Sequence, residues 1–206
     1  MRRAKHHAAT RLLDQNFEFD GRKYRYFHHP YNRTSINERI VEIPIFTELM
    51  KSAPDEDTLE IGNVMAYYVP HRHTVVDKYE KAEGVLNDDV VDYAPGRKFK
   101  LIISISTMEH VGWDEAKKDP AKIPAAIKHL RGLLTEGGRM HITFPMGYNQ
   151  DLDRVLRAES LPMAKRTCLK RVSDTQKWRQ VEWDEIKDEA YGPYANGLVV
   201  AEFTPS

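Results

Sequence analysis

The sequence has a single cysteine, no charge excess and no long apolar run, and each of these absences excludes a class of protein. With Cys168 as the only cysteine in 206 residues, neither a disulfide nor a thiolate metal cluster can form within the chain. The 31 basic and 31 acidic side chains cancel, whereas a nucleic-acid groove needs a basic excess. No segment approaches the ~20 apolar residues that span a membrane, and the N-terminus lacks the apolar run of a signal peptide. We therefore expect a soluble, cytoplasmic protein with no nucleic-acid or membrane partner.

The composition that remains is that of a globular domain. Hydrophobic residues make up 41% of the chain, which is enough for one full core at this length. We expect an N-terminal entrance or lid segment over residues 1–53 and an α/β domain over residues 54–206, together forming one compact unit. Nothing in the sequence establishes an oligomeric state.

The N-terminal segment combines a predicted hairpin with a predicted helix. Residues 17–27 alternate aromatic and polar side chains around a central Asp-Gly pair, a pattern typical of a β-hairpin. Apolar residues on one face predict a helix from Ile36, capped by Thr34 or Ser35 and kinked at Pro44. Its many polar side chains leave two interpretations open, a lid over a site or an ordinary amphipathic helix with solvated charges.

The central stretch, from Thr58 to Asp77, has the pattern of a nucleotide-binding unit. A short apolar run over 59–61 ends at Gly62, and a second run over 75–76 ends at Asp77. Ligands of open parallel sheets bind beyond the carboxyl ends of the strands, where a glycine admits close approach and an acid can accept ribose hydroxyls. A single glycine after a strand is common, so this pattern indicates little until the next elements of the chain are considered.

The next elements form a strand–helix–strand unit. Residues 99–106 are a nearly continuous apolar run suited to the centre of a parallel sheet. Asp119 and Pro120 predict the start of a helix that ends at Gly137 and carries Leu134 on its apolar stripe. The remaining expected elements are a brief strand or turn at 85–86, a strand at 139–144, a helix at 152–159, a hairpin of 167–172 with 178–183, a short helix at 184–190 and a strand at 198–203. This order predicts a Rossmann-like, doubly wound and mostly parallel sheet with an antiparallel C-terminal edge.

At this level of detail the sequence resembles a known family. The segments LEIGNV, VVD, FKLIISISTMEHVG and LRGLLTEGGRMHITFPMG resemble the successive motifs of class I S-adenosylmethionine-dependent methyltransferases, over residues 58–148. The chain is also similar to small methyltransferase-like proteins linked to glycan or secondary-metabolite biosynthesis. The resemblance implies a methyltransferase-type fold, S-adenosyl-L-methionine as the cofactor, and methyl transfer to a small-molecule or sugar-containing acceptor.

The resemblance also implies a set of cofactor-binding residues by position. The loop after the first strand would wrap the methionine and ribose, an acid after the second strand would hold the ribose, and an acid after the third would contact the adenine. These positions are Glu60, Gly62 and Asn63, then Asp77 with Lys78, then Asp89 with Asp88 as its alternative, and finally Ser106, Thr107 and Met108 past the fourth strand.

Two departures from the family pattern affect the loop after the first strand. The family's glycine-rich GxGxG is here Gly62-Asn63-Val64-Met65-Ala66, with one glycine. Each missing glycine adds a Cβ and restricts positive φ, although Asn63 is the residue best able to replace a glycine in a left-handed conformation. The short distance from Gly62 to Asp77 also leaves little room for a first crossover helix.

Candidate groups for the chemistry lie beyond the central strand and in the N-terminal segment. His110 is the proposed general base because its intrinsic pKa suits proton transfer at neutral pH; alternatively it caps the next helix or orients the cofactor, and His28 or His29 supplies the base. Arg39 is a candidate for the cofactor carboxylate. Acceptor contacts are predicted at Tyr31, Asn32, Arg33, Tyr148 and Asn149, with Tyr191, Tyr194 and Asn196 as further candidates.

Other interpretations remain open at this stage. His71 and His73 form an H-x-H pair, but without a third ligand nearby a packing or solvated role is favoured over a metal site. A nicotinamide-dependent enzyme of Rossmann type would need a fuller glycine fingerprint, and the sequence has no Tyr-x-x-x-Lys. A non-catalytic binding or assembly protein built on a degenerate methyltransferase fold is the third possibility, and the reduced glycine loop supports it.

Overall fold

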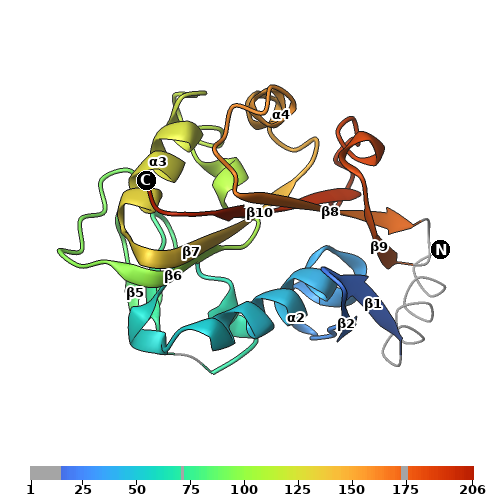
Figure 1. Cartoon of the computed structure of the whole chain (residues 1–206), viewed down its shortest axis with the longest axis horizontal. Helices are drawn as coiled ribbons and strands as arrows, with labels where there is room; N and C mark the ends of the chain where they lie inside the picture. The colour runs from blue at the N-terminus through green and yellow to red at the C-terminus, as the bar shows by residue number, and fades with distance from the viewer. Residues whose placement is uncertain (1–14, 71, 173–175) are drawn as a thin grey trace. The chain divides into compact units, whose positions relative to one another are not determined.

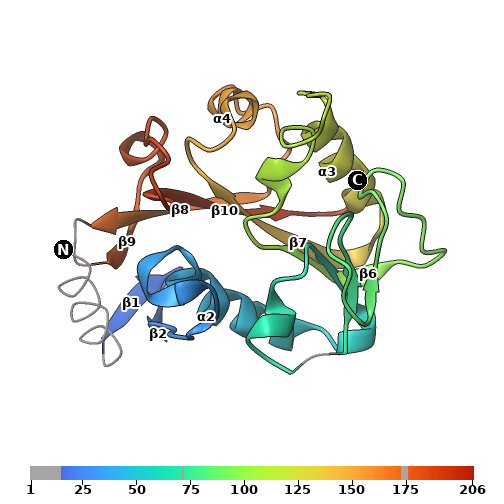
Figure 2. The same cartoon turned by 180° about the vertical axis from the view of Figure 1, so that it is seen from behind.

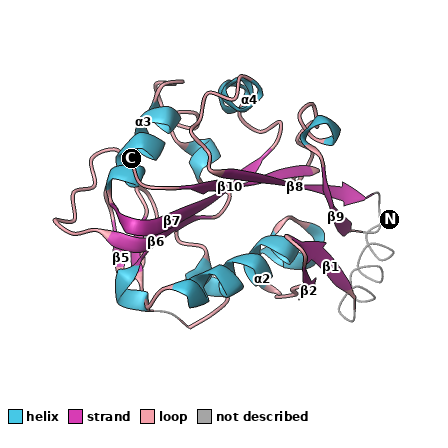
Figure 3. Cartoon of the chain, in the orientation of Figure 1, coloured by secondary structure: helices cyan, strands magenta, loops and turns pink. Residues whose placement is uncertain are grey.

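The computed structural model of the chain describes residues 15–70, 72–172 and 176–206, which form two compact units (Figure 3). Unit 1 comprises the described residues up to Leu49 together with Pro145–Tyr148 and Thr167–Val199. Unit 2 comprises Met50–Phe144, Asn149–Arg166 and Val200–Ser206. No helix in the described part of the chain is both long enough and apolar enough to cross a bilayer.

Unit 2 is built on a parallel sheet whose strands pair in the order β5-β4-β3-β6-β7 (Figure 1). Their bounds are β3 (Thr58–Ile61), β4 (Thr74–Val76), β5 (Val85–Leu86), β6 (Phe99–Ser104) and β7 (Leu134–Pro145). All four residues of β3 are buried, and so are five of the six residues of β6. Strands buried on both faces are the expected consequence of near-continuous apolar runs.

Two helices of unit 2, α3 (Lys122–Gly132) and α4 (Gln150–Arg157), lie on the same side of the strands in both views (Figures 1 and 2). α3 buries Ile123, Ile127 and Leu130 as the apolar stripe predicted. The helix is shorter than expected, however, and Leu134 is the first residue of β7. β7 begins so early because Gly137 and Gly138 let it shift register against β6, with Phe99 opposite Leu134 and Leu101 opposite Arg139.

In its described residues, 62–70 and 72–73, the connection between β3 and β4 contains one turn of 3-10 helix, Met65–Tyr67, and no α-helix. The short crossover inferred from the distance between Gly62 and Asp77 is therefore confirmed. Asn63, the residue best able to replace a glycine, does not have to do so here, because Gly62 itself adopts the left-handed conformation, with φ 86°. No other residue of 62–67 has a positive φ, so this turn needs only one glycine.

Unit 1 contains the predicted hairpin, β1 (Asn16–Phe19) with β2 (Arg22–Arg25), and the helix α2 (Arg39–Leu49). The predicted helix start is wrong. A 3-10 helix over Tyr31–Ile36 comes first, and the Asn37 side chain accepts a hydrogen bond from Arg39 N at 3.1 Å, so neither Thr34 nor Ser35 provides the cap.

Pro44 lies inside α2 without ending it. A proline leaves the carbonyl four residues earlier without its helical donor. In α2 that carbonyl belongs to Ile40, and it accepts a hydrogen bond from Phe27 N at 3.0 Å. The segment before the helix thus supplies the donor that the proline removes.

The C-terminal strands are β8 (Lys165–Val172), β9 (Lys177–Val181) and β10 (Gly197–Phe203), and they complete an eight-stranded order β5-β4-β3-β6-β7-β10-β8-β9. β8 and β9 pair antiparallel, as the predicted hairpin requires. The helix expected over 184–190 is wrong, because only Trp183–Glu185 forms a 3-10 turn. The predicted fold class, a mostly parallel α/β sheet with an antiparallel C-terminal edge, is confirmed.

Candidate functional site

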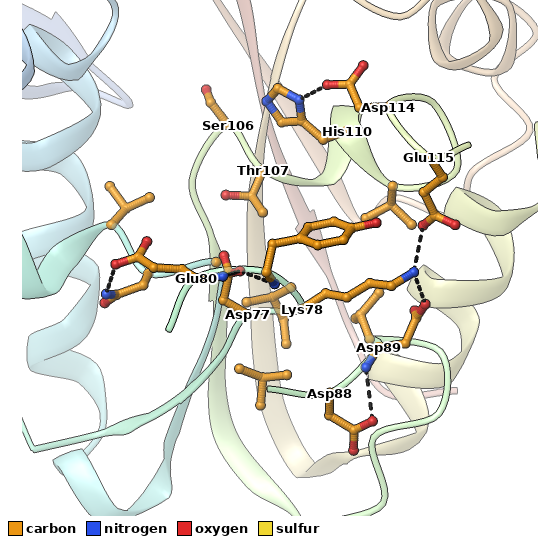
Figure 4. A pocket seen from close by; sticks show the side chains of 18 residues that line it. Asp77, Lys78, Glu80, Asp88, Asp89, Ser106, Thr107, His110, Asp114 and Glu115 are labelled. Carbon is orange, nitrogen blue, oxygen red and sulfur yellow. Dashed lines mark hydrogen bonds and ion pairs between the residues drawn. The ribbon is translucent and has the colours of Figure 1, made fainter. Parts of the chain in front are cut away.

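A pocket of about 690 Å³ opens in unit 2 where β3, β4, β5 and β6 end (Figure 4). Because β5, β4, β3 and β6 are parallel neighbours, their carboxyl ends bring four separate loops to one place. The volume is within the range of pockets that hold small-molecule ligands and cofactors. Eight of the residues predicted for a cofactor or catalytic role line it, namely Gly62, Asn63, Asp77, Lys78, Asp89, Ser106, Thr107 and His110.

Gly62 and Thr107 are in close contact on the wall of this pocket. A Cβ built on Gly62 would lie 2.3 Å from Thr107 Oγ1, and the residue holds φ 86°, so both the space and the backbone conformation require glycine. Next to Thr107, Ser106 has φ 38°, a strained value for a residue with a side chain. The Ser106 amide donates to Thr143 Oγ1 at 2.8 Å, a contact that holds this conformation in place.

Glu60 holds the loop after Gly62 in place: its Oε1 accepts hydrogen bonds from Val64 N at 3.0 Å and Met65 N at 2.9 Å. Glu60 is fully buried and does not line the pocket, so it acts on a ligand there only through the loop. Asn63 is also buried, with its Nδ2 donating to Glu80 Oε1 at 2.7 Å. Its Oδ1 is buried without a partner among the described residues, although Asn63 lines the pocket. A buried acceptor in this position fits a ligand that carries a donor.

Asp77 directly follows β4 and begins the next turn. Its Oδ1 accepts hydrogen bonds from Tyr79 N at 2.8 Å and Glu80 N at 2.7 Å, so one carboxylate oxygen caps the turn. Among the described residues no partner contacts Oδ2. The same side chain can thus cap the loop with one oxygen and accept from a ligand with the other.

Four alternating charges lie together at the end of the pocket near β5 and α3. Asp89 Oδ2 lies 2.8 Å from Lys78 Nζ and 2.6 Å from Lys122 Nζ, and Glu115 Oε1 lies 2.6 Å from Lys122 Nζ and 3.3 Å from Lys78 Nζ. Figure 4 shows Lys78 extended between the two acids. Burial alone would raise the pKa of Asp89, but the hydrogen bonds from Lys122 and Lys78 lower it to about 2. The hydrogen bond to Asp89 is the main cause that raises the pKa of Lys78.

His110 lies at the other end of the pocket, in the 3-10 turn Met108–His110. Its Nδ1 lies 2.6 Å from Asp114 Oδ2, and its Nε2 lies 3.6 Å from Glu109 Oε1. A histidine whose Nδ1 is paired with a carboxylate has a fixed tautomer and a defined orientation. Sequence reasoning missed both Asp114 and Glu115. The spacing of four residues between His110 and Asp114 was an available signal, because it places the two side chains on one side of a helical turn.

Two other predicted residues of unit 2 lie outside the pocket lining. Met108 is fully buried in the core. Asn149 is the N-cap of α4: its Oδ1 accepts from Asp151 N and Leu152 N, while its Nδ2 donates to Glu109 O at 2.8 Å. Both the oxygen and the nitrogen of the Asn149 amide therefore make hydrogen bonds within the protein. This disfavours the predicted contact of Asn149 with the molecule that accepts the methyl group.

The remaining predicted contacts belong to unit 1, namely Tyr31, Asn32, Arg33, Arg39 and Tyr148. Arg39 forms an ion pair with Glu42, whose side chain is fully buried, while the Arg39 side chain is 12% exposed. The hypothesis that Arg39 holds the cofactor carboxylate has to compete with this pairing, since the guanidinium already compensates a buried acid. Tyr148 packs edge-on against Tyr191, with ring centroids 5.1 Å apart.

Unit 1 also buries a second acidic group, Glu38. Its Oε2 accepts a hydrogen bond from Ala195 N at 3.1 Å and lies 3.9 Å from Arg171 Nη2. Burial, followed by the charge of Glu42, raises the pKa of the Glu38 carboxyl. Glu38 therefore has a structural role in unit 1. Of the H-x-H pair, His73 pairs with Glu60 and His71 lies outside the described residues; no metal-ligand cluster occurs among the residues that are described.

No protein-family model and no curated protein matches the chain. Among solved structures, it is similar to N-methyltransferase NodS from Bradyrhizobium japonicum WM9 in complex with S-adenosyl-L-homocysteine, with 14% identity, 98% of this chain and 99% of that chain covered, and a TM-score of 0.47. A TehB-like S-adenosylmethionine-dependent methyltransferase from Corynebacterium glutamicum has 18% identity, coverage of 77% and 85%, and a TM-score of 0.48. The glycopeptide N-methyltransferase MtfA with S-adenosyl-L-homocysteine has 11% identity, coverage of 87% and 100%, and a TM-score of 0.48.

In this chain, the parallel order β5-β4-β3-β6-β7 places the pocket at the ends of β3, β4, β5 and β6. The loop after β3, the acid after β4 and the acids after β5 meet at this one pocket. The sequence motifs that carried the resemblance are therefore adjacent in space as well as in order.

Proposed function

We propose that unit 2 binds S-adenosyl-L-methionine in this pocket and that the protein transfers its methyl group to a small-molecule or sugar-containing acceptor. The observation that carries the proposal is the convergence of Gly62, Asp77, Asp88 and His110 on one cavity of about 690 Å³. These residues come from four loops of the sheet, and each has the chemistry that a different part of the cofactor or the reaction requires.

Each ligand-facing group is assigned to a different part of the cofactor. Asp77 accepts from the ribose hydroxyls through Oδ2, because Oδ1 is used by the turn. The buried Asn63 Oδ1, which lacks a partner among the described residues, accepts from the amino group of the methionine part. Asp88 is the better candidate for the adenine amino group, because Asp89 already accepts hydrogen bonds from two lysines. The contact predicted at Asp89 is then indirect, through the position of its neighbour.

When bound, the cofactor supplies an electrophilic methyl group on a positively charged sulfur. The chain positions the acceptor and receives its proton. His110 Nε2 takes that proton, and Asp114 keeps the ring oriented and stabilises the positive charge that the imidazole gains. The acceptor oxygen or nitrogen forms the new bond to the methyl carbon as the carbon–sulfur bond breaks.

Acceptor contacts are proposed at Tyr31, Asn32, Arg33 and Tyr148 of unit 1. Tyr31 is 46% exposed, so its ring is accessible to a ligand. Asn32 and Arg33 hold left-handed backbone conformations, with φ of 51° and 46°. Such conformations cost free energy and concentrate at ligand-binding sites.

The first test is calorimetric titration of the purified protein with S-adenosylmethionine and S-adenosylhomocysteine, with NAD as the control. We expect micromolar binding of both sulfur nucleotides and none of NAD. Binding of NAD alone would indicate a nicotinamide-dependent enzyme. Absence of binding by a folded protein would mean that the reduced glycine loop has closed the site, and would favour a non-catalytic binding role.

Substitution of Asp77 tests the ribose contact. We expect Asp77→Ala and Asp77→Asn each to weaken S-adenosylhomocysteine binding by tenfold or more, about 1.4 kcal/mol. Only Asp77→Ala should also lower the melting temperature, because the asparagine keeps a side-chain oxygen that can accept from Tyr79 N and Glu80 N. Calorimetry and thermal melts measure the two effects separately. Unchanged affinity of Asp77→Asn for S-adenosylhomocysteine would contradict the assignment of Asp77 to the ribose.

Substitution of His110 tests the general base. We expect His110→Ala to lower the rate of S-adenosylhomocysteine formation by roughly 10²- to 10⁴-fold, assayed against a panel of sugars and amino sugars, while calorimetric binding of the cofactor stays within twofold. Asp114→Asn should give a smaller loss of rate and leave cofactor binding unchanged. In this variant His110 Nε2 can still accept the proton, but the ring is no longer oriented by a carboxylate at Nδ1. Wild-type turnover by His110→Ala would contradict the proposal that His110 is the general base.

A further inference from the structure

The loop that lines the pocket after β3 has one glycine, and its backbone is held by a side chain instead. Val64 N and Met65 N are separated from β3 by the turn at Gly62, and both donate to Glu60 Oε1, at 3.0 and 2.9 Å. Met65 is fully buried and Val64 lines the pocket. These two backbone donors therefore depend on one buried carboxylate, because buried amides without an acceptor are costly.

The second oxygen of that carboxylate has its own partner, His73. His73 Nε2 lies 2.7 Å from Glu60 Oε2, and both side chains are completely shielded from solvent. Glu60 lies in β3 opposite Val75 of β4, and His73 directly precedes β4, so the parallel pairing of the strands brings the two side chains together. A carboxylate accepts hydrogen bonds, so His73 donates from Nε2.

Removing one partner of a buried pair leaves the other without compensation. Without a donor at His73, the buried Glu60 carboxylate would lose its hydrogen bond at Oε2 and would turn toward another donor. That turn takes correct geometry away from Val64 N and Met65 N, which share its other oxygen. The loss is therefore transmitted to the segment from Gly62 to Val64, which forms part of the pocket wall.

We infer that His73 is a positioning residue, which acts through Glu60 to fix the loop from Gly62 to Met65 in the conformation that receives the cofactor. The chain thus compensates for missing glycines with a buried histidine–glutamate pair. The effect of this pair on the cofactor rests on the proposed function, whereas its effect on the order of the loop does not. His73 touches no reacting atom in this scheme.

The experiment compares His73→Leu, which removes the donor, with His73→Gln, whose amide can reach the position of Nε2. His129→Leu is the matched control, because His129 Nε2 also makes a hydrogen bond in unit 2, to Tyr93 O at 2.8 Å, but His129 does not line the pocket. Two quantities are measured: amide hydrogen exchange at Val64 and Met65 without any ligand, and calorimetric affinity for S-adenosylhomocysteine.

We expect His73→Leu to raise the exchange rates of both amides at least tenfold and to weaken S-adenosylhomocysteine binding at least tenfold. His73→Gln should recover most of both losses, and His129→Leu should change neither. Protection of the two amides that is unchanged in His73→Leu would overturn the inference. A wild-type protein that binds no S-adenosylhomocysteine would refute the proposed function, while the exchange measurement would still decide the role of His73.

If His73→Leu does not fold, His73→Gln is compared with His73→Asn, whose shorter amide cannot reach the position of Nε2. Faster amide exchange in His73→Asn than in His73→Gln supports the positioning role. Equal exchange in the two variants overturns it, because a purely structural role for a polar group would not depend on where the donor lies.

Discussion

We expect Gly62→Ala to weaken S-adenosylhomocysteine binding by at least about a hundredfold, or about 2.8 kcal/mol. The residue holds φ 86°, where a Cβ costs roughly 1–2 kcal/mol, and that Cβ would lie 2.3 Å from Thr107 Oγ1 and 2.6 Å from Thr107 Cγ2. Relief requires Thr107 to give up its hydrogen bond to Ile105 O or the loop to shift. The first response displaces Thr107 and the second displaces Gly62, and both residues line the pocket.

Gly84→Ala is the matched control for this prediction. Gly84 has a similar φ of 80°, but a Cβ built on it meets nothing within 4 Å, and it does not line the pocket. It should therefore lose stability from backbone strain and keep its affinity. Calorimetry on Gly62→Ala, Gly84→Ala and the double variant Gly62→Ala/Thr107→Ala separates strain from collision, with partial recovery expected in the double variant. Wild-type affinity in Gly62→Ala would show that the cofactor does not depend on this wall.

The second large effect is expected at Arg39, where removal of the side chain should lower the free energy of unfolding by about 3–5 kcal/mol. The reason is Glu42, whose fully buried carboxylate forms an ion pair with Arg39. Burial and then the charge of Glu42 raise the pKa of the neighbouring Glu38 carboxyl, whereas the charge of Arg39 lowers it, so a second acid depends on Arg39. Urea unfolding of Arg39→Ala measures the loss.

Two comparisons sharpen this test. Arg22→Ala removes a side chain that lies 3.6 Å from Glu48, with both partners partly exposed, and should cost at most about 1 kcal/mol. Replacing the buried pair together, as Arg39→Met/Glu42→Leu, should recover most of the loss, because apolar residues of similar volume remove the need for compensation.

The same variant decides between the two roles considered for Arg39. A structural role predicts equal changes in affinity for S-adenosylmethionine and its decarboxylated analogue. A selective loss for the carboxylate-bearing cofactor, without loss of stability, would instead support the contact predicted from the sequence.

The fold was largely predictable because its signals are local. The apolar run of β6, the stripe on α3 and the aromatic alternation of the hairpin β1-β2 each report burial at a period set by the backbone. The errors fall where a tertiary contact outweighs local propensity. α3 ends at Gly132 because β7 pairs with β6 from Leu134 onward.

The candidate site was predictable in kind but not in its pairings. The sequence marked Gly62, Asp77 and His110 by their places after apolar runs, and all three line the pocket. It could not show that Asp89 is held by Lys78 and Lys122 or that Glu60 pairs with His73. Partners separated by up to 33 residues leave no periodic signal, because their proximity depends on the order of strands in the sheet.

By itself, then, the sequence determined the class of fold, the order of its elements and the loops that form a site. These follow from hydrophobic periodicity, glycine and the chemistry of single side chains, which act over a few residues. Only the tertiary structure decided which charged groups face a ligand and which compensate one another. That distinction depends on burial and on distances of a few ångströms, and both are set when separate segments pack together.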